Sequence, residues 1–199
     1  FLYGLHLNGV LTSAVVLPIV GFVDLGILFY PIAFLLIIFM VNAVNLTDGI
    51  DGLASSVTFV VMLAYVIAAG VLNYFHLAVY AAAVAGGCAG FLLWNFHPAK
   101  VFMGDTGSMY LGGAVTALAF CMSRPELLLF FGFIYICEAG SVVIQVSYFK
   151  ATHGKRIFKM TPIHHSFEMD GWSEEKIVAS FSLVAAAAAA LGLVFIRLS

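Results

Sequence analysis

Apolar stretches about as long as a membrane is thick recur along this chain, and they constrain its fold more than any other feature. Hydrophobic residues make up 63% of the 199 residues and charged residues 9%, and the mean hydropathy is +1.11. Soluble domains carry roughly 25% charged residues, and a soluble fold of this length could not bury so much apolar surface. The sequence therefore predicts an all-α fold, a polytopic integral membrane helical bundle.

Six apolar stretches are long enough to cross a membrane as helices. A seventh, residues 1–23, is interrupted by polar residues and by Pro18, and it is interpreted as the end of one span followed by a broken segment. We expect six to seven spans, with residues 1–199 forming a single transmembrane domain. The six stretches are residues 27–46, 53–72, 77–94, 108–122, 127–149 and 173–197.

Three polar loops separate these spans, and alternation of the spans puts all three on one side of the membrane. They are residues 42–54, 95–107 and 150–173. That side carries most of the basic residues, and by the positive-inside rule it faces the cytoplasm. We therefore expect the polar loops to converge into one site on the cytoplasmic face. The basic residues on that side are Lys100, Lys150, Lys155, Arg156, Lys159 and Lys176, against Arg124 and Arg197 on the other.

The first loop, with the sequence NAVNLTDGIDGLA, concentrates polar residues where two spans end. Polar side chains are costly in hydrocarbon, so this density indicates a site. Asn45, Asp48 and Asp51 are spaced three apart, which would stack them on one side of a helical turn. Gly49 allows the backbone to approach a ligand closely. The alternative is a loop whose Asn and Asp residues only cap helices.

The second loop, NFHPAKVFMGDTGS, places Asp105 between two glycines at the start of a helix. Such a carboxylate suits Mg²⁺, which takes oxygen ligands and few of them from protein, but it suits helix capping equally well. Phe102 can stack on a flat ring or anchor at the membrane interface. Further along the chain, Gln145 lies at the cytoplasmic end of a polar helix face that also carries Glu138, which we expect to have a structural hydrogen-bonding role.

The third loop contains two adjacent histidines, His164 and His165, after a basic stretch. A zinc site would need further ligands, yet the three cysteines lie in apolar runs and no His-x3-His is present, so zinc is disfavoured. As anion ligands, the histidines would donate hydrogen bonds while the neighbouring Lys and Arg residues raise the local potential. The alternative is a basic loop that binds anionic lipid headgroups.

Together the three loops resemble the phospho-N-acetylmuramoyl-pentapeptide transferases, a branch of the polyprenyl-phosphate N-acetylhexosamine-1-phosphate transferase superfamily. The first two loops are shared across that superfamily in looser form, whereas TPIHH followed by FE and GWSE is specific to this branch. The resemblance implies transfer of phospho-MurNAc-pentapeptide from UDP-MurNAc-pentapeptide to undecaprenyl phosphate, giving lipid I and UMP, with Mg²⁺ as cofactor. It also implies a homodimer in the bacterial cell membrane, in contact with membrane lipid and with no nucleic-acid partner.

The resemblance assigns roles by motif position. Asp105 is the expected metal ligand and Asn45 a second metal contact. His164 and His165 match the motif that contacts the sugar phosphate, and with Asp105 they are the expected catalytic residues. Phe102 is expected to stack on uracil. The other expected substrate contacts are Asn45, Asp48, Gly49, Ile50, Asp51, Asn95 and Gln145.

The chain departs from the family pattern at two places. The family usually has three consecutive histidines, and Ser166 stands in the third position. The family also has an Asp-Asp pair on an earlier loop and about ten transmembrane helices, against the six or seven that apolar stretches predict here. No Asp-Asp pair occurs in this chain, which begins without Met inside apolar sequence. We therefore expect it to be the C-terminal portion of the enzyme.

Two other functions fit parts of the pattern. One is a sister transferase that uses UDP-GlcNAc with the same lipid phosphate, although the TPIHHSFE sequence argues against it. The other is a transporter, whose polar residues should lie in the middle of its spans and in repeated halves. Here the polar residues cluster at helix ends on one side, which favours an enzyme.

Overall fold

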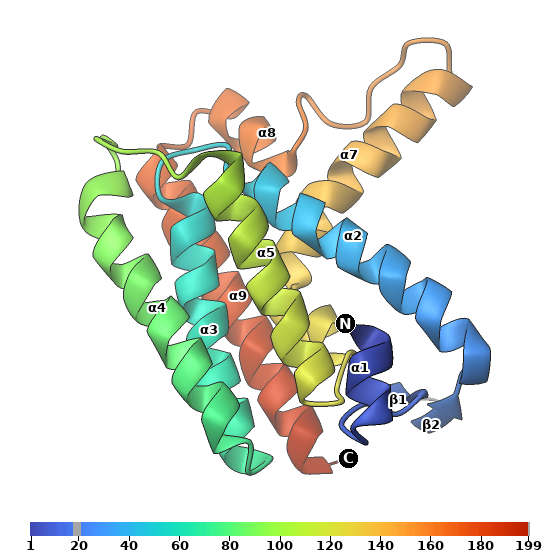
Figure 1. Ribbon diagram of the computed structural model, residues 1–199. Helices are drawn as coiled ribbons and strands as arrows, with labels where there is room; N and C mark the ends of the chain where they lie inside the picture. The colour runs from blue at the N-terminus through green and yellow to red at the C-terminus, as the bar shows by residue number, and fades with distance from the viewer. Residues whose placement is uncertain (18–20, 199) are drawn as a thin grey trace.

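A computed structural model describes residues 1–17 and 21–198, and most of these residues are helical (Figure 1). The prediction of an all-α membrane bundle is confirmed, apart from one short antiparallel hairpin in which Ala14 lies opposite Asp24. In chain order the elements are α1 (Leu2–Leu7), β1 (Ala14–Leu17), β2 (Gly21–Asp24), a 3-10 turn η1 (Gly26–Leu28), α2 (Phe29–Thr47), α3 (Leu53–Val71), α4 (Phe75–Asn95), α5 (Gly104–Cys121), α6 (Leu127–Phe131), α7 (Phe133–Ala151), α8 (Ile163–Met169) and α9 (Glu174–Leu198).

Among the described residues, four helices are long and apolar enough to cross a membrane. Helices occupy all six of the long apolar stretches expected to be spans, and four of them meet this measure of length and composition. Helices α5 and α7, with 18 and 19 residues, occupy two of the expected spans but carry more polar residues. Polar residues in such helices normally face the interior of the bundle. The four spans are Gly26–Thr47, Leu53–Val71, Phe75–Asn95 and Glu174–Leu198.

The expected partial span at residues 1–23 is not found in the described part of that region. Helix α1 has only six residues, and the hairpin of β1 and β2 follows it. Valines at positions 15, 16 and 23 explain the change, because β-branched side chains favour strands over helices. Pro18 lies outside the described residues.

The expected helix at 127–149 is divided into α6 and α7 at Gly132. A side chain at this position would lie 2.5 Å from the carbonyl oxygen of Leu128 and 2.5 Å from Cε of Met40, so only glycine fits against α2 here. The polar segment after α7 also contains a helix, α8, which the sequence analysis did not predict. This short helix carries both histidines of the third loop.

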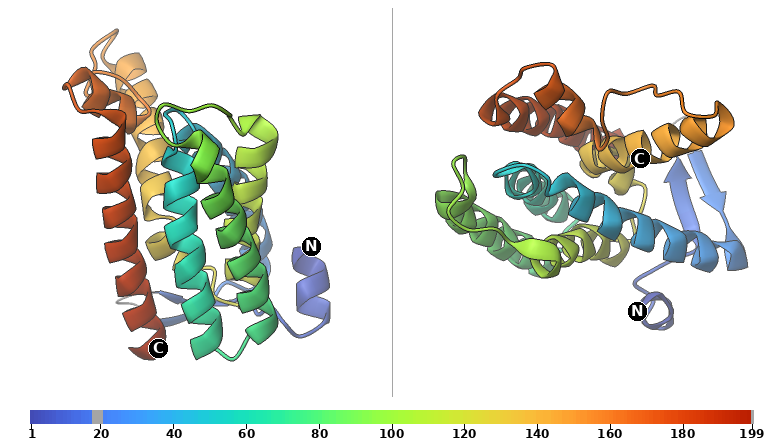
Figure 2. Two further views of the ribbon diagram at one scale, coloured as in Figure 1. Left: turned by 90° about the vertical axis from the view of Figure 1, so that its left-hand side faces the viewer. Right: turned by 90° about the horizontal axis from the view of Figure 1, so that it is seen from above.

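Helix α3 forms the centre of the bundle and packs against α4 and α9 (Figures 1 and 2). In a membrane, helices are held together by packing and by hydrogen bonds between polar side chains, because lipid is as apolar as the core. Two tyrosines supply such bonds. The hydroxyl of Tyr65 donates to the carbonyl of Val115 in α5 at 2.9 Å, and the hydroxyls of Thr58 and Tyr135 lie 2.8 Å apart.

The three polar loops lie at the same end of the bundle, the upper end in Figure 1. Helices α2 and α4 end there, and α3, α5 and α9 begin there. Helix α9 begins with Ser173 as its cap, whose Oγ accepts the backbone N–H of Lys176 at 3.4 Å. Helix α7 leans away from the bundle, and the chain returns from its end to α8, above the α2–α3 turn. This geometry brings segments far apart in sequence to one polar end.

Candidate functional site

Asn45 joins α2 to α5 at the polar end. Its Nδ2 donates hydrogen bonds to Asp105 Oδ1 at 3.1 Å and to Ser108 Oγ at 2.8 Å. Helix α5 begins at Gly104, four residues before the start predicted from the sequence, so Asp105 and Ser108 both lie in its first turns. The structure thus brings together Asn45 and Asp105, the two residues expected to contact a metal.

Asp48 lies just after α2 and is half-buried beside this pair. Burial raises the pKa of Asp48 to about 6, and the negative charge of Asp105 contributes to the same shift. Two carboxylates that repel each other at a partly desolvated position form a setting that a cation would stabilise. The end of α2 and the start of α5 therefore make an acidic site rich in oxygen atoms that could bind a cation.

His164 is fully buried, and so is its partner Glu138 in α7. His164 Nδ1 donates to Glu138 Oε2 at 2.9 Å. Its Nε2 has no hydrogen-bond partner among the described residues and points at the α2–α3 turn. A Cβ atom at Gly49 would lie 2.2 Å from that nitrogen, so glycine is required for the turn to lie against the ring. His164 is thus packed directly against the first loop.

His165 is the more accessible histidine. Its side chain is 26% exposed, its Nδ1 donates to Glu168, and its ring centre lies 4.1 Å from that of His164. Ser166, at the position of the usual third histidine, exchanges hydrogen bonds with the backbone of Met160 at 2.9 and 3.2 Å. In this chain the third position therefore stabilises the loop, and His165 is the histidine that an anion can reach.

Asn95 and Gln145 hold the loops in place. Asn95 is buried, donates to the carbonyl of Val101 at 3.0 Å and accepts a bond from Ser55 at 3.1 Å. Gln145 is buried as well, and its Oε1 accepts two backbone N–H groups of the loop after α7, those of Ile157 and Phe158, at 3.1 and 3.0 Å. Their direct contact with a nucleotide stays a prediction.

Phe102 and Ile50, both expected at the nucleoside pocket, have opposite surroundings. Phe102 is 73% exposed on the α4–α5 loop, so its ring is free to stack on another ring. The side chain of Ile50 is buried in the apolar core, which leaves only its backbone for a ligand. Both assignments to a nucleoside pocket stay predictions.

Asp51 lies in a group that the sequence analysis missed. Its Oδ2 accepts the backbone N–H of Ala99 at 2.8 Å and Nδ1–H of His97 at 3.1 Å. Glu174 accepts the backbone N–H of Asp51 at 2.9 Å, and its other oxygen lies 3.5 Å from His97 Nδ1. Among the described residues, these three side chains form a group that could hold a metal ion. No local sequence signal connects them, because they come from three separate segments.

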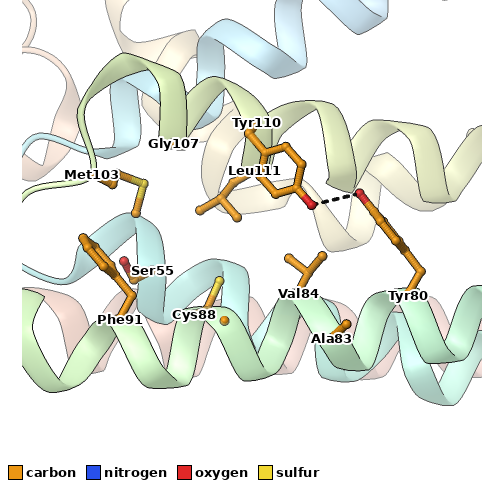
Figure 3. Close-up of a pocket in the computed structure, with 11 residues that line it drawn as sticks. Ser55, Tyr80, Ala83, Val84, Cys88, Phe91, Met103, Gly107, Tyr110 and Leu111 are labelled. Carbon is orange, nitrogen blue, oxygen red and sulfur yellow. Dashed lines mark hydrogen bonds between the residues drawn. The ribbon is translucent and has the colours of Figure 1, made fainter.

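An apolar cavity of about 350 Å³ lies between α4 and α5 (Figure 3). Met103 and Gly107 border it at the end near Asp105. At the other end the hydroxyls of Tyr80 and Tyr110 lie 3.4 Å apart and bridge the two helices. The cavity is suited to hydrocarbon and unsuited to a charged group, because its lining offers few polar partners.

The fold and the polar end define a polytopic membrane protein with its acidic and histidine residues gathered at one end of the helical bundle. The model of glycosyl transferase family 4 matches residues 2–123, more than half of the chain. The chain belongs to this family.

The chain is also similar to curated bacterial proteins, each named phospho-N-acetylmuramoyl-pentapeptide-transferase. It is 47% identical to that of Acetivibrio thermocellus over 98% of this chain and 60% of the relative. It is 46% identical to that of Caldicellulosiruptor bescii over 100% of this chain and 61% of the relative. It is 51% identical to that of Heliobacterium modesticaldum over 85% of this chain and 52% of the relative. The chain therefore spans about 60% of the length of the first two relatives. The expected family is confirmed.

Proposed function

We propose that this chain provides the polar site of an enzyme that transfers phospho-MurNAc-pentapeptide from UDP-MurNAc-pentapeptide to undecaprenyl phosphate, giving lipid I and UMP. The observation that carries the proposal is the hydrogen bond between Asn45 and Asp105, at the same end of the bundle as the two histidines. The names of the similar proteins point to the same reaction.

The Asn45–Asp105 site fits Mg²⁺. The negative charge of Asp105 helps to raise the pKa of Asp48, which shows that negative charge at the site is not neutralised. The Asp and Asn side chains also provide oxygen atoms that can bind a cation. Mg²⁺ takes few ligands from protein, which suits Asp105 with Asn45 in support. The group of Asp51, His97 and Glu174 includes an imidazole, which suits transition metals better than Mg²⁺. When bound, Mg²⁺ would neutralise charge on the diphosphate and on the departing UMP.

The remaining groups bind and orient the substrates. Phe102 is exposed and would stack on uracil, beside the turn formed by residues 48–51. His165 is accessible and would donate to the sugar phosphate, while Lys159 and Arg156 add positive charge nearby. The diphosphate of the donor substrate and the phosphate of the acceptor lipid repel each other. The hydrogen bond from His165 and the positive charges of Lys159 and Arg156 would offset that repulsion. The apolar cavity beside α5 would keep water from one side of the site.

A donor-selectivity assay tests the proposal. The intact membrane protein, undecaprenyl phosphate and Mg²⁺ would be incubated with either UDP-MurNAc-pentapeptide or UDP-GlcNAc. We expect lipid I and UMP from the first donor alone. Product from UDP-GlcNAc alone would favour the sister transferase, and the absence of product from both would overturn a transferase function.

The setting in the cell is part of the same proposal. The polar end carries most of the basic residues, which supports a cytoplasmic active site in the bacterial cell membrane. The resemblance to the family supports a homodimer. Thiol labelling of a cysteine introduced at Lys155, from either side of sealed vesicles, tests the orientation. The mass of the detergent complex tests the dimer.

A further inference from the structure

Three segments far apart in sequence meet at Asp51, His97 and Glu174. Asp51 is in the α2–α3 turn, His97 is in the α4–α5 loop, and Glu174 begins α9. Their side chains are 19%, 37% and 27% exposed, so the group lies near the surface of the polar end. We call it the Asp51–His97–Glu174 clasp.

The clasp uses both the side chain and the backbone of Asp51. The carboxylate accepts Ala99 N–H and His97 Nδ1–H through Oδ2, and the backbone N–H donates to Glu174. Oδ1 is the oxygen of Asp51 that these contacts leave for a ligand. The orientation of Asp51 is therefore set by the other two members of the clasp.

The clasp also sets the start of the loop that carries Phe102. Ala99 is held by Asp51, and Val101 is held by the buried amide of Asn95. Phe102 follows directly, so these two attachments fix the backbone from which its exposed ring projects. A change in the clasp would move the stacking residue relative to the turn formed by residues 48–51.

We propose that His97 and Glu174 are positioning residues for nucleoside binding, with the His97 side chain lying between the carboxylates of Asp51 and Glu174. The proposal rests on the proposed function and adds residues for which the sequence analysis assigned no role in the site.

The surroundings of His97 favour its protonated form. Partial desolvation lowers the pKa of His97, but the hydrogen bond to Asp51 and the charges of Glu174, Glu175 and Asp51 outweigh that effect. The pKa is therefore raised above its usual 6.5. Only the protonated ring carries the positive charge that attracts both carboxylates. The clasp is therefore complete below this pKa and weakens as the pH rises through it.

The experiment measures calorimetric binding of uridine to the intact protein from about pH 5 to about pH 8, a range in which histidine titrates. Uridine carries no charge in this range, so no phosphate group of the ligand titrates. His97→Gln should weaken binding by roughly fivefold or more at low pH, and its affinity should lack the decline with rising pH that we expect for the wild type. Asp48 titrates in both proteins, so the difference between them isolates His97.

Glu174→Gln gives a second variant, which should weaken binding without removing the pH dependence. Matched controls are Glu175→Gln, which makes the same change one residue along and keeps every hydrogen bond of the clasp, and His76→Gln at the opposite end. Both controls should keep wild-type affinity at low pH. Because the charge of Glu175 helps to raise the pKa of His97, the decline in Glu175→Gln should begin at a lower pH, whereas His76→Gln should keep the wild-type profile. Melting temperatures identify any variant that fails to fold.

The outcomes separate two failures. Absence of uridine binding in the wild type would overturn the proposed function itself. Wild-type binding with an unchanged affinity and pH profile in His97→Gln and Glu174→Gln would overturn the positioning role alone. Stabilisation of the wild type by Zn²⁺ alone, lost in His97→Gln, would instead show a metal site and overturn the imidazolium clasp.

Discussion

His164 donates a hydrogen bond of 2.9 Å to Glu138, and both side chains are fully buried. A carboxylate can only accept, so the proton lies on Nδ1 and Nε2 is directed at Gly49. The pair links a membrane helix, α7, to the histidine helix α8 and to the α2–α3 turn. It therefore couples the interior of the bundle to the candidate site.

Gly49→Ala tests this contact. The added methyl group would lie 2.2 Å from His164 Nε2, and a fully buried ring has little room to move. We expect a loss of roughly 1–3 kcal/mol of stability, together with reduced turnover. Thermal unfolding and lipid I formation would be measured. Gly140→Ala is the control, because a methyl group there would meet no atom within 4 Å; similar behaviour of the two variants would contradict the contact.

The two histidines should respond differently to replacement by alanine. His164→Ala leaves Glu138 buried without its partner, which costs roughly 3–5 kcal/mol, so its melting temperature and turnover should fall together. His165→Ala removes a partly exposed pair with Glu168, and its stability should change by less than about 1 kcal/mol. If His165 contacts the sugar phosphate, its single-turnover rate should nevertheless fall sharply. Full activity of His165→Ala in neutral detergent would remove it from the site.

Asp105→Asn should reduce turnover by about 100-fold or more, because a neutral amide holds Mg²⁺ poorly and leaves phosphate charge uncompensated. Added MgCl₂ should raise the melting temperature of the wild type and should have little effect on the variant. Asp170→Asn, which removes a carboxylate paired with Lys159 on the third loop, is the control. An Mg²⁺-induced shift of equal size in Asp105→Asn would exclude Asp105 as the metal ligand.

Phe102→Ala should weaken the binding of uridine-containing ligands by roughly 1–3 kcal/mol, the usual contribution of a ring stacked on a base. Its melting temperature should stay constant, because the ring is 73% exposed. Phe75→Ala, a similarly exposed phenylalanine at the opposite end, controls for loss of contact with detergent. Calorimetry that finds equal affinities for the wild type and Phe102→Ala would return Phe102 to the role of interface anchor.

The pH dependence of stability should reveal Asp48. Its pKa is raised from 3.8 to about 6, so the folded protein binds this proton more tightly than the unfolded chain does. Its contribution to stability is therefore present below pH 3.8 and is lost as the pH rises to about 6. Relative to the wild type, Asp48→Asn should gain melting temperature across this window and then level off. Parallel curves for the two proteins would be inconsistent with the raised pKa.

The fold class and the position of the polar end were predictable from the sequence, because the length and hydropathy of a span are local properties. The spans at Gly26–Thr47 and Leu53–Val71 agree with the predicted boundaries to within one residue. The hairpin formed by Ala14–Leu17 and Gly21–Asp24 was missed, because an apolar β-branched run does not distinguish strand from helix. The same ambiguity explains why residues 1–23 were interpreted as the end of a span.

The alternation of the spans along the chain was enough to predict that Asn45, Asp48, Asp105 and the two histidines lie at one end of the bundle. Their hydrogen-bond partners could be identified only from the folded structure. His164 could not be assigned to Glu138, 26 residues away, nor Asp51 to Glu174, 123 residues away. The physical reason is that a hydrogen bond depends on the positions of atoms in space. Those positions follow from how α2, α5, α7 and α9 pack together, which no local pattern in the sequence specifies.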